Sequence, residues 1–197
     1  MSFILTANWL TISNRALLLC GKTQISSFTD GSNEASVMQD LLPVAADYCF
    51  GQYNFDCNRK QAQLAVSGEI PKFGFDYFYV FPIDFCHLDE VTTEENGAWK
   101  LYRDGIYTDS PTLYITYFAY PSEPDDMNVA MRDLMVKYLA YISCMTLTHD
   151  SQLQASLQKD ANSALSALMR GNGDMSGSAD DTSQELYSNS HIMGGLE

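Results

Sequence analysis

The stretch FGFDYFYVFPIDF, from Phe73 to Phe85, has an aromatic ring at most of its positions in a chain that is otherwise acidic. Tyr77 and Tyr79 alternate with Phe78 and Val80, which is the period of a β-strand with bulky side chains on both faces. The later run PTLYITYFAY, residues 111–120, alternates in the same way. A strand with one face in water has polar side chains on that face. We therefore expect both strands to be covered on two sides, by the chain itself or by a neighbouring subunit.

Exposed rings in such a run could instead stack on nucleic-acid bases. That mechanism normally comes with Lys and Arg side chains that hold the phosphate backbone, and none occurs between Phe73 and Trp99. Packing in a core or against another subunit is the favoured interpretation, because aromatic side chains bury large areas and are enriched at interfaces. The residues expected at a subunit interface are Phe75, Tyr77, Tyr79, Tyr114 and Phe118.

The composition limits the function classes. The 197 residues include 11 Lys and Arg against 25 Asp and Glu, a formal net charge of -14, so tight binding to a phosphate backbone is not expected. No apolar run reaches the roughly 20 residues that span a bilayer, which predicts a soluble protein made in a cytoplasm. The five cysteines contain no CxxC pair and are expected to be reduced.

Helical patterns flank the aromatic strands. Residues 7–19 and 34–50 repeat apolar side chains at helical spacing, with Pro43 as a break in the second helix. After the strands, Ser122 is the expected N-cap of a third helix that has Pro124 in its first turn and runs to Leu147. Thr148 or Asp150 should restart a fourth helix that folds back on the third.

These patterns predict an α+β fold, an antiparallel helical bundle of two helix pairs with an inserted antiparallel β subdomain and a flexible C-terminal tail. The expected parts are an N-terminal helix pair (1–52), the β subdomain (53–121), a C-terminal helix pair that completes the bundle (122–171) and a tail (172–197). The tail is rich in Gly, Ser and Asp, so burial cannot offset its ordering entropy.

No catalytic signature is present. The sequence has no GxSxG, Walker A, HExxH or GxGxxG motif. His87 and Asp89 could supply two metal ligands from one strand face, but a half-exposed strand histidine is the simpler interpretation. His149 beside Asp150 fits a helix cap. The acidic pairs 94–95, 125–126 and 180–181 fit solvated charge or a helix N-terminus. We expect no enzyme, no metal and no cofactor.

Several segments together resemble a known family. They are NRALLLCGKTQISSFTDGS (14–32), a second helix ending in CFGQYNFDCNRKQAQLA (49–65), the aromatic run through Val91, and TLYITYFAYP (112–121) before a late helix pair. Over about residues 12–171 the chain resembles the tail tubular protein A family, the head-to-tail adaptors of short-tailed bacteriophages. It departs from the family in Tyr53, where Trp is frequent, and in its acidic balance. The motifs mark a fold, and no catalytic residue is transferred.

The resemblance implies a structural virion protein at the junction of head and tail. Such adaptors form a ring of about twelve copies below the portal protein, extend the DNA channel and support the next tail protein, a nozzle or tubular protein. Acidic side chains that face the channel would keep DNA phosphates from sticking during genome ejection. The apolar residues of the tail are expected to order on the portal; they are Leu186, Tyr187, Ile192 and Met193.

Two other classes of function stay open on the residues alone. One is a hydrolase with an unrecognised carboxylate site, which would need acidic side chains of raised pKa in a closed pocket. The other is a non-viral binding module whose sheet recognises a peptide or a sugar.

Overall fold

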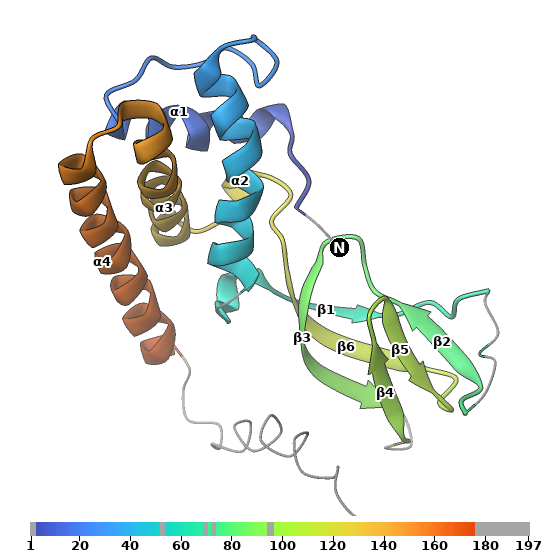
Figure 1. Cartoon of the computed structure of the whole chain (residues 1–197). Coiled ribbons are helices and arrows are strands. Elements are labelled where there is room, and N and C mark those ends of the chain that lie inside the picture. Colours follow the sequence, from blue (N-terminus) through green and yellow to red (C-terminus); the bar gives the residue numbers. More distant parts are fainter. Residues whose placement is uncertain (1–2, 52–53, 69–70, 72–73, 94–96, 176–197) are drawn as a thin grey trace, which may run out of the picture.

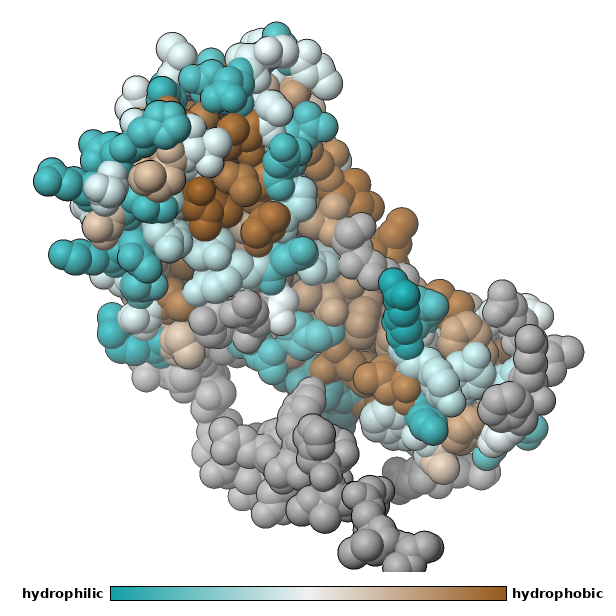
Figure 2. Space-filling model, in the orientation of Figure 1, coloured by the Kyte–Doolittle hydropathy of each residue, from teal (hydrophilic) through white to brown (hydrophobic). Residues whose placement is uncertain are grey.

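The computed structural model describes residues 3–51, 54–68, 71, 74–93 and 97–175. Within them the chain is mixed α+β, with four α-helices and two small antiparallel sheets. The helices are α1 (Leu10–Leu19), α2 (Asn33–Gly51), α3 (Val129–Thr148) and α4 (Ser151–Met175), with short 3-10 helices η1 (Ala7–Trp9), η2 (Asp56–Asn58) and η3 (Pro124–Asp126). The strands are β1 (Arg59–Gln63), β2 (Tyr77–Val80), β3 (Phe85–Thr93), β4 (Trp99–Tyr102), β5 (Gly105–Thr108) and β6 (Leu113–Ala119). The helices lie together at one end and the strands at the other (Figure 1), and hydrophobic residues reach the surface at both ends (Figure 2).

Helix α3 is the centre of the helical part. It packs against α1, α2 and α4, and its side chains Met131, Met135 and Leu139 are fully buried. Trp9 and Leu42 join the same apolar core from η1 and α2. Tyr48 of α2 stacks on Tyr138 of α3. Because apolar burial is the main favourable term in folding, this shared core holds the helices together.

Helices α3 and α4 form the predicted hairpin. His149 closes α3 in the left-handed conformation, with a φ of 56°. The carboxylate of Asp150 then accepts hydrogen bonds from the N–H groups of Gln152 and Leu153, at 2.9 and 3.0 Å. These two N–H groups have no partner within the helix, so Asp150 is the N-terminal cap of α4. The alternative restart at Thr148 is not used, because Thr148 is the last residue of α3.

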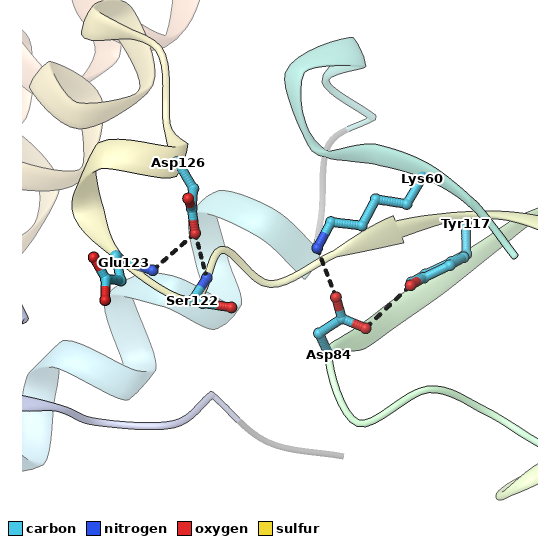
Figure 3. Close-up of polar contacts among 6 residues, drawn as sticks. All are labelled: Lys60, Asp84, Tyr117, Ser122, Glu123 and Asp126. Carbon is cyan, nitrogen blue, oxygen red and sulfur yellow. Dashed lines mark hydrogen bonds and ion pairs between the residues drawn. The ribbon is translucent and has the colours of Figure 1, made fainter.

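The start of α3 differs from the prediction. Asn128 is the N-cap, and its side-chain oxygen accepts a hydrogen bond of 2.8 Å from the N–H of Met131. Pro124 begins the separate turn η3, where the Asp126 carboxylate accepts hydrogen bonds from the N–H groups of Ser122 and Glu123 (Figure 3). Ser122 was therefore the wrong cap. The sequence pattern of cap, proline and acidic residues was satisfied by a 3-10 turn instead.

The last helix extends beyond the residue at which the tail was predicted to begin. Helix α4 continues to Met175, so residues 172–175 belong to the helix. The remaining part of the predicted tail, residues 176–197, lies outside the described residues.

The strands form two three-stranded sheets that share a core. One sheet has the order β1-β6-β3 and the other β2-β5-β4, and every pairing is antiparallel. Leu113, Ile115 and Tyr117 of β6 pack with Tyr79 of β2 and Ile106 of β5. The two sheets thus cover each other, which confirms that the aromatic strands are covered from within the chain on at least one face.

Residues at the ends of β3 and β6 connect the sheets to the helices. Tyr120 follows β6 and donates a hydrogen bond of 2.8 Å to the Asp47 carboxylate on α2. The thiol of Cys86 on β3 donates to the backbone carbonyl of Phe50, at 3.4 Å. Both side chains also pack against the helical core. In the part of the chain that the structure describes, none of the helices has the apolar length that a membrane span requires.

Candidate protein interface

The core-facing rings of the aromatic run are covered by the chain itself. Tyr79 has 0% of its surface exposed, and its hydroxyl donates a hydrogen bond of 3.0 Å to the carbonyl of Ser110. Phe81 stacks on Phe85 with ring centroids 3.8 Å apart, and Tyr77 packs against the same core. The side chains that the period-two pattern groups on the face of Tyr77 and Tyr79 are therefore those that lie between the two sheets.

Two of the five predicted interface residues have little surface to offer a neighbour. Tyr79 lies between the sheets, and Phe118, on the other face of β6, is only 4% exposed and stacks on the ring of His87. Tyr77 is half-buried. Tyr114 is 43% exposed on the outer face of its sheet, and Phe75 is half-buried beside Tyr107. A subunit interface remains a prediction, but within this set only Tyr114, Phe75 and Tyr77 have accessible surface for it.

Rings also gather on the outer face of the β2-β5-β4 sheet. Phe78 stacks on Tyr107 at a centroid distance of 4.5 Å, and Tyr102 meets Tyr107 edge to face at 4.6 Å. The ammonium of Lys100 lies 5.7 Å from the centre of the Tyr102 ring. These residues form a partly exposed aromatic surface that joins three strands. It accounts for the second face of the aromatic run, which the sequence showed to be bulky.

Strand β4 is the most exposed apolar element among the strands described. Trp99, Leu101 and Tyr102 are 44%, 52% and 44% exposed. Trp99 and Leu101 pair with Thr108 and Ile106, which are fully buried on the core-facing side of the sheet. Their side chains point to that same side and are nevertheless exposed, and no side chain of β4 belongs to the core that the two sheets share. The three apolar side chains of this edge strand define what we call the β4 edge (Trp99, Leu101 and Tyr102).

The sequence contained a signal for the β4 edge that the interface prediction missed. WKLYRDGIY has two short runs around an Arg-Asp pair, a pattern typical of a hairpin. The pairing of Tyr102 with Gly105 confirms such a two-residue connection. No pattern in the sequence says whether a hairpin strand ends up at the edge of a sheet. Free backbone N–H and C=O groups at an apolar edge favour pairing with another chain.

A polar groove lies on the outer face of the other sheet. It has a volume of about 300 Å³ and is lined by side chains of β1, β3 and β6. Its residues are Gln61, Ala62, Gln63, Glu90, Thr92, Tyr114, Ile115 and Thr116. The groove thus offers amide, hydroxyl and carboxylate groups around the exposed ring of Tyr114.

The two candidate metal ligands are engaged with other residues. The carboxylate of Asp89 lies 2.7 Å from the guanidinium of Arg59, and Nε2 of His87 lies 2.6 Å from the side-chain oxygen of Asn54. Burial lowers the pKa of His87, while the negative charge of Asp89 opposes that shift. The ring of His87, stacked on that of Phe118, is thus a packed side chain. Among the described residues no group of three or more His, Cys, Asp or Glu could hold a metal ion.

The other chemical candidates are similarly accounted for where the structure describes them. Asp125 pairs with Arg132 at 2.9 Å, and Asp126 accepts the backbone bonds described above. The pairs at 94–95 and 180–181, and the predicted portal-binding residues Leu186, Tyr187, Ile192 and Met193, lie outside the described residues. Burial raises the pKa of the Cys49 thiol to about 12 and that of Cys20 to about 11. Neither thiol is therefore poised to act as a thiolate nucleophile.

Comparisons with known proteins add no assignment: no protein-family model matches the chain, and no curated protein matches it.

Proposed function

We propose that this protein is a structural virion component, a head-to-tail adaptor that forms a ring below the portal of a short-tailed bacteriophage. The ring would extend the DNA channel and carry the next tail protein, without catalysing a reaction. The sequence resemblance supports this function. In this proposal the four helices form an antiparallel bundle that provides the rigid wall, and the strands are a subdomain inserted between the two helix pairs.

The observation that carries the proposal is the β4 edge. Trp99 and Leu101 are exposed on the core-facing side of an edge strand, which is an unfavourable arrangement for a protein that stays monomeric. Apolar side chains of this kind gain free energy when a second chain covers them. Head-to-tail contacts between identical copies close into a ring when the rotation between neighbours divides a full turn.

Two further features belong to the proposal. The acidic balance of the chain would keep the channel wall from holding DNA phosphates, since like charges repel. The apolar residues of the C-terminal segment, Leu186, Tyr187, Ile192 and Met193, would order on the portal. Replacing these four residues by Ser should weaken portal binding without changing the helical content of the chain, and unchanged binding would refute this part.

The experiment that tests the whole proposal measures the mass of the protein alone and with its portal, followed by electron microscopy of the particles. Discrete rings, free or seated on the portal, are the expected result. A stable monomer that does not bind the portal would overturn the proposal. A channel surface that is neutral or basic in the ring would overturn only the role given to the negative charge.

A binding module is the second candidate, because the polar groove on the β1-β6-β3 sheet offers amides, hydroxyls and the exposed ring of Tyr114. A screen of oligosaccharides and peptides by calorimetry distinguishes the two candidates. Binding that is lost in Tyr114→Ala, by a chain that stays monomeric with the portal present, would favour the module.

A further inference from the structure

An open apolar groove lies between α1 and the first half of α3. Its volume is about 850 Å³. Val129, Leu18 and Leu19 line it and are 76%, 56% and 42% exposed. Three large aliphatic side chains in one depression are rarely left to water in a folded chain, because covering them stabilises by about 25 cal/mol per Å².

The rim of this groove is basic in a strongly acidic protein. The lining has a single carboxylate, that of Asp133, and three cationic side chains, those of Arg15, Arg132 and Lys137. Lys137 pairs with Asp133 at 2.6 Å, and Arg132 pairs with Asp125. Arg15 forms no ion pair within the part of the chain that the structure describes. The groove therefore suits an occupant that is apolar and negatively charged.

The C-terminal segment 176–197 has this chemistry. It contains Asp180, Asp181, Glu185 and Glu197 with no Lys or Arg. Leu186 and Tyr187 directly follow Glu185, so that an apolar pair is placed next to a carboxylate.

The hairpin of α3 and α4 brings this segment to the groove. Helix α4 runs back along α3 after a two-residue turn (Figure 1). From the lengths of the two helices, Arg170 of α4 is at about the level of Val129, and α4 ends at Met175, about one turn further on. Val129 lies in the groove, so the chain leaves α4 at the groove's end of the hairpin. From Met175 to Glu185 an extended chain spans up to roughly 33 Å. That exceeds the width of two packed helices, about 20 Å.

We infer that the groove between α1 and α3 holds the C-terminal segment of the same chain, with Leu186 and Tyr187 against Leu18, Leu19 and Val129. The carboxylate of Glu185, which directly precedes this apolar pair, faces Arg15. The inference goes beyond the proposed function and does not depend on it. If both hold, portal binding has to draw the segment out of the groove, since the same side chains cannot fill two sites.

Hydrogen exchange of the full chain, read by mass spectrometry, tests the inference. Amides of residues 183–194 should be protected, and the double variant Leu18→Asp, Val129→Asp should raise their exchange rate about tenfold or more. Ile83→Asp is the matched control, because Ile83 is 75% exposed in the connection between β2 and β3 and lies outside the groove. It should leave these amides unchanged. Arg15→Glu should raise the exchange rate less than the double variant does, and more at low salt than at high salt.

A photo-crosslinking amino acid at Leu19, in a chain otherwise unchanged, provides a second measurement that does not depend on the stability of the variants. A mixture of isotopically light and heavy chains shows whether a crosslink joins residues of one molecule. Crosslinks from position 19 to residues 183–194 within one chain are expected. Unprotected amides in the unmodified chain, or crosslinks that join only different chains, would overturn the inference.

Discussion

The hydroxyl of Tyr117 donates a hydrogen bond of 3.1 Å to the carboxylate of Asp84 (Figure 3). The other carboxylate oxygen of Asp84 lies 2.7 Å from the ammonium of Lys60. Tyr117 lies on β6, Lys60 on β1, and Asp84 directly before β3, so the three side chains fasten all strands of one sheet at the end nearest the helices.

Because of this contact, the stability of the fold should decrease with rising pH in the alkaline range. Burial, and secondly the negative charge of Asp84, raise the pKa of Tyr117 from an ordinary value of 10 to about 12. The folded chain thus holds this proton more tightly than the unfolded chain, and the resulting stability is complete below pH 10 and lost as pH rises towards 12. Denaturant unfolding at about pH 9 and about pH 11 should show a smaller loss in Tyr117→Phe than in the unmodified chain. Equal losses would contradict the prediction.

Gly105 is required by its surroundings at the start of β5. A Cβ atom there would lie 1.9 Å from the backbone carbonyl oxygen of Tyr79 on the paired strand. Since neither backbone can give way without breaking the sheet, Gly105→Ala should lower the free energy of unfolding by about 3 kcal/mol. Gly68→Ala is the control, because a Cβ atom at Gly68 meets nothing within 4 Å, and it should change stability by less than about 1 kcal/mol. Similar unfolding midpoints for both variants would show that the sheet tolerates the clash.

The cap of α3 distinguishes the observed helix start from the one expected from sequence. Asn128→Ala removes the acceptor of the Met131 N–H and should cost about 1 kcal/mol. Ser122→Ala should stay within about 0.5 kcal/mol, because the Asp126 carboxylate binds the backbone of Ser122 and not its hydroxyl. Thermal unfolding followed by circular dichroism measures both. A larger effect of the Ser122 variant would restore the original expectation.

His87 contributes stability with the opposite dependence on pH. Burial lowers its pKa below the ordinary 6.5, so the folded state favours the neutral ring. The associated stability is present above pH 6.5 and is lost as the pH falls through the lowered pKa. His87→Gln, which cannot ionise, should lose less stability than the unmodified chain between about pH 7.5 and about pH 5. Identical pH profiles would mean that the imidazole is solvated.

If neighbouring copies cover the β4 edge, a charged side chain in this strand should prevent assembly of the proposed ring. Leu101→Lys places an ammonium on a side chain that is already 52% exposed in the single chain, so it should leave the fold intact and prevent burial against a neighbour. Analytical ultracentrifugation should show a monomer. Ile83→Lys, at a more exposed position outside this strand, should still assemble. Rings formed equally by both variants would place the subunit contact elsewhere.

Helices were predictable from sequence where the signal was local. The capping carboxylate of Asp150 and the apolar repeats of α2, α3 and α4 depend on neighbours within a few residues, so their existence followed from the printed order. Ser122 failed as a cap because Pro124, Asp125 and Asp126 fit a 3-10 turn as well as an α-helix start. Local patterns cannot distinguish these two outcomes.

The sequence by itself determined that the rings of Tyr77–Val80 and Leu113–Ala119 lie on both faces of strands, because side chains alternate between the two faces of any β-strand. Only the tertiary structure decided which rings are covered. Tyr79 became core and Trp99 stayed exposed, because the core shared by the two sheets includes side chains of β2 and β5 and none of β4. The extent of that cover depends on contacts between residues far apart in the chain, which no local pattern encodes.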